Sequence, residues 1–446
     1  MESTLESTLI LTIFALVFYL IFTGREDRNL VIIYGASATV LTGMMMGFYS
    51  PIAIVQSVNF ETLFLLFGMM LYSKIMADTG VFQSWAIKIA RFSNNDPWLT
   101  LTSFALITFI LSLFINNFTT IVIIVPITVL LCINLGMRPI PVVITEVIAS
   151  NLGGASSMVG DFPNMLISSS TPYDFFDFLM YMLPICLLGL ATLLLYLFVR
   201  GESLLIDKKI GVLGGGKIPK MNEFKAALQC DPYKIYIGYM IFFLMVVMFI
   251  LATTVKIPPS TTAIVGSILA LIFVSSDRKK VVTEFNYRDI IFFFCLFVMV
   301  GAIEATGALT MLSYYIWVAS NGSEFMQGVY TLVSAGFLTI ILNAGPTTAL
   351  YLPVVGELYN YGQHEFIFWA LSLGVCAGSS AAITGATAGL VASNYLSDYA
   401  KENDIHGTKD YVYFDLTFRK FMNIGIPFMG IFMVLSSVYL WVRFCT

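Results

Sequence analysis

Ten apolar runs, each close to the length that crosses a bilayer, constrain this chain more than any other feature. The hydrocarbon core of a bilayer is about 30 Å thick, which an α-helix spans with about 20 residues. The runs lie at 5–23, 30–48, 62–77, 141–169, 178–199, 234–253, 260–276, 288–304, 366–393 and 420–442. Only 11% of the 446 residues are charged, against about 25% in soluble domains. The sequence therefore predicts an all-α polytopic membrane protein.

Two further apolar stretches, 98–135 and 325–361, have polar residues at their centres and are predicted to be re-entrant helical hairpins. With the N-terminus outside and both hairpins entering and leaving on one side, 21 of the 23 basic residues fall on one face. Only Lys256 and Arg443 fall opposite. Because Lys and Arg concentrate on the cytoplasmic side, we predict ten spans in the plasma (inner) membrane with both termini outside. The first run follows the acidic MESTLEST, so we expect it to be retained rather than cleaved.

The longest polar stretch, 201–233, is predicted to be a cytoplasmic linker between two halves. Lys217 ends a glycine-rich run with Walker A spacing. Ile218 stands where Ser or Thr would hold magnesium, and Pro219 would interrupt the helix that the motif requires. These departures favour a flexible linker over a nucleotide site. The net charge of −4, without a basic tail, argues against a nucleic-acid partner.

The two halves, 1–200 and 234–446, share an internal repeat. At an offset of 227 residues the following pairs match in order: Asn59 with Asn286, Thr79 with Thr306, Gly80 with Gly307, Asn116 with Asn343, Thr120 with Thr347, and Pro126 with Pro353. At an offset of 225, Gly153 matches Gly378 and Gly160 matches Gly385. Because five spans separate equivalent helices, the halves are predicted to lie in opposite orientations. Inverted repeats with broken helices are typical of secondary transporters, whose site lies near mid-membrane between the repeats.

The predicted hairpin turns, 115–120 and 343–348, carry the same residue types in both halves. Their polar members are Asn116, Thr119 and Thr120 in the first turn, and Asn343, Thr347 and Thr348 in the second. A new half-helix begins after each turn, so its partly positive N-terminus is expected to point at a central site. The alternative is that these side chains only cap the helix ends.

The run that follows the first hairpin is polar and rich in glycine at mid-depth. Ten residues, or about 15 Å of helix, separate Pro141 from Asn151. Ser150, Asn151, Asp161 and Asn164 then follow one another around a predicted helix break. The counterpart in the second half is 378–387, which includes Gly378 and Thr384. Close helix packing is the competing explanation for the small residues, but it does not account for the amides and the carboxylate.

Ionisable side chains are scarce in the predicted membrane interior, and Asp161 is the best candidate for a functional one. Glu146 and Glu304 lie nearer helix ends, where either could extend to an interface. No Lys or Arg is predicted at mid-depth. An anionic substrate would therefore be held by helix ends, by Asn, Ser and Thr, or by a co-bound cation.

Three stretches resemble the ion transporter superfamily, which includes the arsenite permease and P protein families and, more distantly, the divalent-anion/sodium symporters. SNLGGASSMVGDFPN (150–164) is similar to the SN-x-GG and GD-x-PN pattern of the first two families. NNFTTIVIIVP (116–126) resembles their first hairpin, and LGVCAGSSAAITGATAGLVAS (373–393) resembles their later glycine-rich helix. The resemblance implies a scaffold, a moving transport domain that holds both hairpins, a homodimer, and an elevator-type motion.

We therefore predict a secondary active transporter of a small anion or neutral oxyacid, driven by a Na⁺ or H⁺ gradient. The predicted substrate site comprises Asn116, Thr119, Thr120, Asn151, Asn343, Thr347, Thr348 and Thr384. The predicted cation-coupling residues are Asp161, Ser150, Asn164, Asn117 and Gly378. No cofactor is expected; Na⁺ is considered as a coupling ion, which could bind near Asn116, Asn151 and Asn343.

Three other functions are considered. One is a passive channel, because coupling to a gradient is invisible in the sequence; accumulation of substrate against a gradient would exclude it. Asp161 also suits a Na⁺/H⁺ antiporter on the same scaffold. A membrane enzyme is disfavoured, because an intramembrane protease needs a Ser–His pair or two buried Asp residues. The chain offers no mid-membrane His and one well-placed Asp.

Overall fold

The computed structural model describes residues 2–24, 26–92, 96–201, 205–206, 232–275, 278–362, 364–403 and 405–444. Within these ranges the chain is helical, and the β-type pairing is one isolated bridge between Met137 and Ile206. The predicted all-α membrane fold is confirmed at this level. Nearly all of the predicted linker 201–233, with its Walker-like glycines and Lys217, lies outside the described residues.

The helices of the first half are α1 (Glu2–Thr23), α2 (Arg28–Met46), α3 (Pro51–Gln56), α4 (Phe60–Asp78), α5 (Val81–Phe92), α6 (Pro97–Ser112), α7 (Asn117–Leu135), α8 (Pro139–Ala155), α9 (Phe162–Ser170) and α10 (Phe175–Arg200). Those of the second half are α13 (Pro232–Val255), α14 (Pro259–Phe273), α15 (Arg278–Thr283), α16 (Tyr287–Ala305), α17 (Ala308–Ala319), α18 (Glu324–Leu342), α19 (Ala344–Gly362), α20 (Phe366–Ser379), α21 (Thr387–Glu402), the 3₁₀ turn η2 (Lys409–Tyr413) and α22 (Phe418–Phe444).

Among the described helices, eight are long and apolar enough to cross a membrane. They are α1, α2, α4, α7, α10, α13, α18 and α22. A ninth is added if α16 and α17, which meet at a bend of 68°, form one span with α15. Two of the ten predicted runs were expected to be broken helices, and both are divided: 141–169 into α8 and α9, and 366–393 into α20 and α21. The run predicted to span the membrane at 260–276 forms a shorter helix, α14. It has 15 residues, because it begins at Pro259 and ends at Phe273.

The order of the helices in the first half recurs in the second half. The bounds of α4, α5 and α7 recur 227 residues later as those of α16, α17 and α19. Gly80 and Gly307 have nearly the same positive φ, 77° and 76°. Pro126 lies inside α7, and Pro353 lies inside α19 at the matching position. The offsets read from the sequence therefore coincide with structural positions over this part of the chain.

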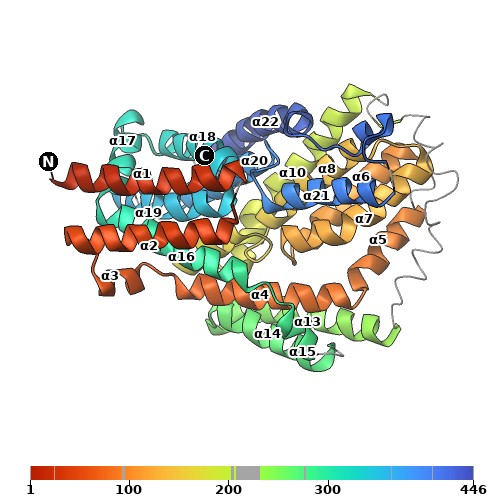
Figure 1. Cartoon of the computed structure of the whole chain (residues 1–446), viewed down its shortest axis with the longest axis horizontal. Coiled ribbons are helices and arrows are strands. Elements are labelled where there is room, and N and C mark those ends of the chain that lie inside the picture. Colours follow the sequence, from red (N-terminus) through yellow and green to blue (C-terminus); the bar gives the residue numbers. More distant parts are fainter. Residues whose placement is uncertain are drawn as a thin grey trace.

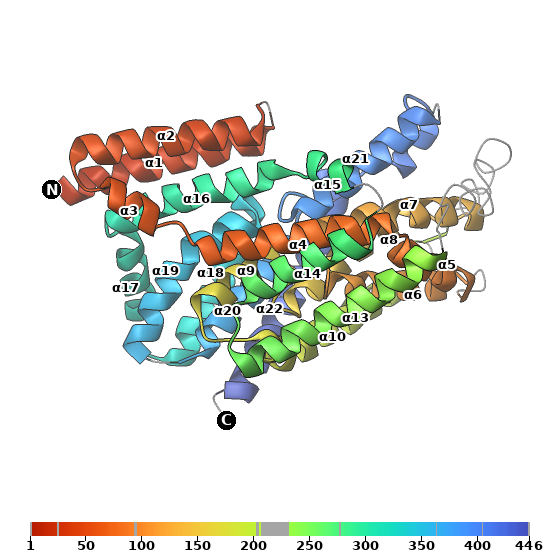
Figure 2. The ribbon, with the colours of Figure 1, turned by 90° about the horizontal axis from the view of Figure 1, so that it is seen from below.

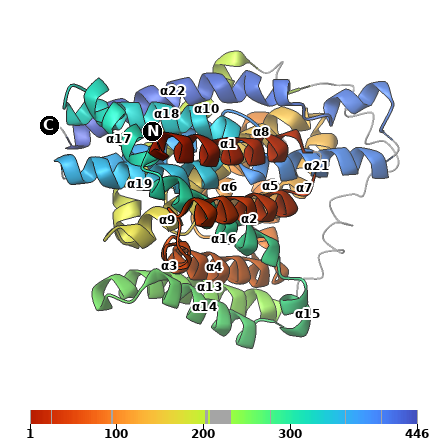
Figure 3. The ribbon, with the colours of Figure 1, turned by 60° about the vertical axis from the view of Figure 1, so that its left-hand side comes forward.

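The two halves contact each other through equivalent helices. α14 lies along α4, and α2 lies along α16, which is the counterpart of α4 (Figures 1 and 3). The helix pair α6–α7 extends toward one end of the molecule, and the pair α18–α19 extends toward the other end (Figures 1 and 2). In addition, α7 contacts α21 and α19 contacts α9, so each pair packs against a broken helix of the opposite half.

Close approach of backbones fixes how each broken helix packs on its hairpin. A Cβ added to Gly153 on α8 would lie 2.2 Å from the carbonyl oxygen of Phe109 on α6. A Cβ added to Gly378 on α20 would lie 2.2 Å from the carbonyl oxygen of Gly336 on α18. A real Cβ cannot approach a carbonyl oxygen this closely, so only glycine allows these two crossings.

We expect Gly153→Ala and Gly378→Ala each to destabilise the protein by about 1–3 kcal/mol, the usual cost of overpacking. Gly430→Ala in α22 is the matched control, because a Cβ there meets nothing within 4 Å. Alanine also has the better helix propensity, so the control should be neutral or slightly stabilising. Thermal unfolding of each purified variant in detergent measures the change in stability. Equal melting temperatures for the three variants would contradict the packing argument.

Candidate functional site

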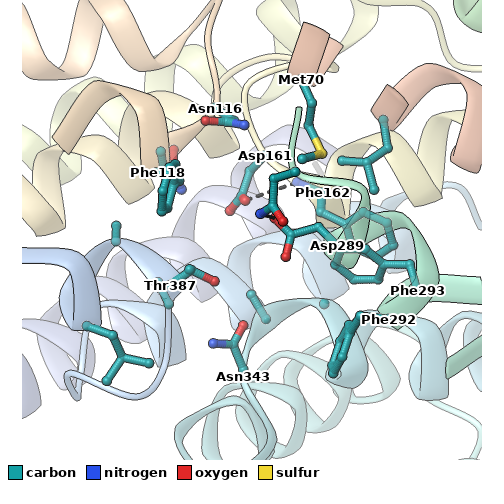
Figure 4. Close-up of a pocket in the computed structure, with 18 of the residues that line it drawn as sticks. Met70, Asn116, Phe118, Asp161, Phe162, Asp289, Phe292, Phe293, Asn343 and Thr387 are labelled. Atoms are coloured by element: carbon teal, nitrogen blue, oxygen red, sulfur yellow. Dashed lines mark hydrogen bonds between the residues drawn. The ribbon is translucent and has the colours of Figure 1, made fainter. Parts of the chain in front are cut away.

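A cavity of about 670 Å³ lies where the two helix pairs and the two broken helices meet, and we call it the central cavity. Its walls include the first turn of α7, the start of α9, the turn between α18 and α19, and the start of α21. Helices α1, α4 and α16 close the remaining sides. In Figure 4, Asn116 and Asn343 lie on opposite sides of the cavity, with Asp161 between them. Its volume is in the range of small-molecule sites.

The first hairpin turn, between α6 and α7, is held by a chain of side-chain hydrogen bonds. The Oδ1 atom of Asn116 accepts from the backbone N–H of Thr119 at 2.8 Å, so Asn116 caps α7. Ser112 Oγ donates to Asn117 Oδ1 at 2.5 Å, and Asn117 Nδ2 donates to Asn151 Oδ1 at 3.3 Å. Asn116 thus caps a helix end and also lines the central cavity.

The second hairpin turn, between α18 and α19, is built differently, because Asn343 is its only residue. Asn343 has φ 77° and ψ 163°, a conformation that favours glycine. Its side chain does not cap α19, since Nδ2 donates to the carbonyl oxygen of Thr384 at 3.1 Å. The N–H of Ala344 donates to the carbonyl oxygen of Gly385 at 3.2 Å. These two bonds fasten the turn to the broken part of the second half.

The break between α8 and α9 is satisfied by its own side chains. Asn164 Nδ2 donates to the carbonyl oxygens of Ala155 and Ser157, both at 2.8 Å. Asn164 Oδ1 accepts from Ser372 Oγ at 2.6 Å. Asp161 is the N-cap of α9, and its Oδ1 accepts from the N–H of Phe162 at 3.0 Å. The partly positive helix N-terminus favours a negative charge on Asp161.

The charged residues that line the central cavity include two bases, and both are paired. Arg28 forms an ion pair with Asp289, and Lys74 forms one with Glu284 at 3.2 Å. No described basic residue forms an ion pair with Asp161. The lining carboxylates that form no ion pair among the described residues are Asp161, which lies between the two turns, and Asp78, at the end of α4.

Comparison with known proteins gives a family that agrees with this architecture. The pattern of the citrate transporter family (CitMHS) matches residues 17–374. The chain belongs to the citrate transporter family. It is also 34% identical to the magnetosome protein MamN of Magnetospirillum gryphiswaldense, over 94% of this chain and 95% of that protein. A 46 kDa membrane protein of Mycobacterium leprae is 29% identical, over 95% of this chain and 96% of that protein.

The human P protein is 25% identical over 93% of this chain and 57% of its own length. The resemblance to the ion transporter superfamily is therefore confirmed. As a member of the citrate transporter family, the chain is a membrane transporter and not an enzyme.

Six of the predicted site residues line the central cavity of this citrate transporter family member. They are Asn116, Asn117, Thr119, Asp161, Asn343 and Thr384. The other predicted site residues do not line it. They are Thr120, Ser150, Asn151, Asn164, Thr347, Thr348 and Gly378.

The side chains outside the cavity mostly bond to nearby backbone. Thr347 Oγ1 donates to the carbonyl oxygen of Asn343, and Thr348 Oγ1 donates to that of Ala344. Ser150 Oγ donates to the carbonyl oxygen of Val147 in its own helix. Thr119, Thr120, Thr347 and Thr348 all lie within the first five residues of a helix and not in the connecting turn itself.

Buried Asn151 is an exception, because it accepts from Asn117 and donates to Ser380 Oγ at 3.5 Å. It lies behind the cavity wall and supports Asn117. Glu304, considered as a candidate from the sequence, is exposed near the end of α16, whereas Glu146 is completely buried.

An aromatic wall of the central cavity was not predicted from the sequence. It comprises Phe118, Phe162, Phe292 and Phe293. The rings of Phe162 on α9 and Phe293 on α16 stack with centroids 3.6 Å apart and planes at 17°. Apolar residues in a membrane span face lipid or protein without a distinguishing local pattern, so these positions had no signal beyond the GD-x-P segment around Phe162.

The cavity boundary predicts opposite reactivities for two adjacent positions. Thr119 lines the cavity, whereas Thr120 is fully buried. In a Cys230→Ser, Cys445→Ser background, in which Cys132, Cys186, Cys295 and Cys376 remain buried, Thr119→Cys should react with a small water-soluble maleimide. Thr120→Cys should react on the order of tenfold more slowly or not at all, since thiol reactivity requires access. Mass spectrometry reads the modification, and equal rates would contradict the assigned boundary.

Proposed function

We propose that this protein is a secondary active transporter of a small anion or neutral oxyacid, coupled to a Na⁺ or H⁺ gradient. Within the citrate transporter family, a small carboxylate is the substrate class that we favour over an arsenite-like oxyacid. One observation carries the proposal: turns from both halves and the break at Asp161 converge on one cavity. Transporters place their sites where two repeats meet.

The repeated helix order supports two inverted halves, 1–200 and 234–446, each with five spans, one re-entrant hairpin and one broken helix. Opposite placement of α6–α7 and α18–α19 is what inversion would produce (Figure 1). Arg28, Lys74 and Glu284 line the central cavity at or near helix ends. The distribution of basic residues favours a cytoplasmic position for this end of the cavity. The termini would then be outside, and the site would open toward the cytoplasm.

The groups at the cavity suit an anion without a basic residue at its centre. Asn116 and Asn343 supply side-chain amides from the two halves. The helices that begin at the two turns, α7 and α19, supply partly positive N-termini. Thr119 and Thr384 complete a neutral polar lining.

A coupling cation is best placed at Asp161. Na⁺ prefers oxygen ligands, and the carboxylate of Asp161 and the amide oxygens of Asn116 and Asn343 face the same cavity. The coupling region also includes supporting residues, which act through the hydrogen bonds and close packing described above: Asn117, Asn151, Ser150, Asn164 and Gly378.

Movement of the hairpins and broken helices against a scaffold of α1–α5 and α13–α17, in a homodimer, would give alternating access by an elevator-type motion.

A Na⁺/H⁺ antiporter is the second candidate function, and the unpaired carboxylate of Asp161 favours it. Vesicles that hold a pH gradient separate the two functions. Proton movement on addition of Na⁺ alone, without any anion, would favour the antiporter.

Substitutions at the two turns test the substrate site. Asn116→Ser keeps a helix cap but shortens the side chain, and Asn343→Gly removes the side chain while fitting the positive φ. We expect each to lower gradient-driven uptake of citrate or arsenite in proteoliposomes about tenfold, since one lost hydrogen bond costs about 1–2 kcal/mol. Asn134→Ala, at the far end of α7 and exposed, is the control. Uptake at the wild-type rate in both turn variants would contradict the assignment.

Thermal stability tests the cation site without knowledge of the substrate. Na⁺ that binds only the folded protein raises its melting temperature, and Asp161→Asn should abolish this rise. Asp96→Asn is the matched control, because Asp96 also caps a helix, outside the cavity, and Asn retains the cap. A Na⁺-dependent rise of the same size in Asp161→Asn would remove Asp161 from the cation site. Absence of a Na⁺-dependent rise in the wild type would contradict a Na⁺ site at Asp161.

A further inference from the structure

A buried polar pair lies outside the central cavity, and the proposed substrate and cation sites do not include it. Glu146 on α8 is fully buried, and its Oε1 accepts a hydrogen bond from Thr128 Oγ1 on α7. The other carboxyl oxygen, Oε2, has no hydrogen-bond partner among the described residues. Neither residue lines the central cavity.

Nothing in the surroundings of Glu146 compensates a negative charge. The nearest basic residue along the chain, Arg138, precedes it by eight residues, about 12 Å of helix. Cys132 on α7 is the titratable group that faces Glu146. The other helices packed on α8, namely α6, α10, α20, α21 and α22, bring no described charged side chain to it. A buried carboxylate with neither a cation nor full hydrogen bonding is strongly disfavoured, whereas the neutral acid is tolerated.

The second half shows that the fold does not require this pair. Glu146 precedes Gly153 by seven residues, and Leu371 precedes Gly378 by the same number. The position of Thr128 in α7 is that of Val355 in α19. Leu371 and Val355 are fully buried, and α19 packs on α20 as α7 packs on α8. The same crossing is thus built from apolar residues in one half and from a carboxyl and a hydroxyl group in the other.

We propose that Glu146 and Thr128 form a proton-binding site between α7 and α8, separate from the central cavity and occupied by a proton in this conformation. The carboxylic acid is neutral while the site is closed from water. Glu146 lies one helical turn before Ser150 at the start of the polar run, and Thr128 shares α7 with Asn116. A rearrangement of the hairpin against α8 would expose the acid and release its proton. This coupling of the proton to transport rests on the function proposed above, whereas occupancy of the site does not.

Infrared spectroscopy of the reconstituted full chain tests occupancy directly. A protonated carboxylic acid has a C=O stretch separate from those of carboxylates and amides. We expect a component of this band in the wild type at neutral pH, its loss in Glu146→Gln, and its persistence in Asp161→Asn. A wild-type spectrum without the band, or a band unchanged in Glu146→Gln, would overturn the proposal.

The repeat supplies a second test that a misfolded variant cannot imitate. The double variant Glu146→Leu, Thr128→Val copies the second half, so it should fold and melt at or above the wild-type temperature, as apolar replacements of buried polar groups often do. Removal of the proton from wild-type Glu146 leaves a buried charge, so the wild-type melting temperature should fall as pH rises from about 6 to about 9. The melting temperature of the double variant should fall less over the same pH range. Parallel curves for the two proteins would overturn the proton site.

Transport of citrate or arsenite provides the third measurement. Glu146→Gln keeps a partner for Thr128 but cannot release a proton, so the pH dependence of uptake should flatten while uptake itself remains measurable. Absence of uptake in the wild type would count against the proposed function and leave the spectroscopic result standing. Wild-type uptake with the same pH profile in Glu146→Gln would refute the coupling role.

Discussion

Helix ends in the middle of a membrane protein must have their backbone groups satisfied without bulk water, and the rest of this structure depends on how that is done. A buried N–H or C=O group without a partner costs several kcal/mol in hydrocarbon. The chain meets this requirement with Asn116 at one turn, with Asn164 and Asp161 at the first break, and with a backbone hydrogen bond from Ala344 to Gly385 at the second turn. Three of these residues, Asn116, Asp161 and Ala344, line the central cavity.

The two halves meet this requirement with different chemistry on the same backbone. At the first break α9 begins after Asp161, and at the second break α21 begins after Ala386. The first turn continues with Asn117, which donates to Asn151, whereas its counterpart Ala344 offers only a backbone N–H. A repeated fold therefore carries an unsymmetrical site, with the carboxylate and most of the amides in the first half. Under the proposed function, such asymmetry would let one half specialise in binding a cation.

Local sequence was enough to predict the turns, the breaks and the candidate carboxylate, because those features depend on Asn, Gly and Pro at positions where helices must end. It was not enough to separate Thr119 from Thr120, since neighbouring residues in a helical turn differ only in the direction they face. The aromatic wall around Phe162 and Phe293 was missed because apolar side chains in a span give the same pattern whether they face lipid, core or cavity. The buried state of Glu146 likewise depends on tertiary packing, which its distance from a helix end does not reveal.

In the proposed function, electrostatics would connect a cation and a substrate in the central cavity. An anion about 4 Å from the carboxylate of Asp161 would be repelled by about 4 kcal/mol at an effective dielectric constant of about 20. Arg28 and Lys74 cannot offset this repulsion fully, because Asp289 and Glu284 already pair with them. A cation at Asp161 would convert the repulsion into attraction, so each ligand would raise the affinity for the other by the same factor. Co-transport would then follow from the placement of one unpaired carboxylate beside the two turns.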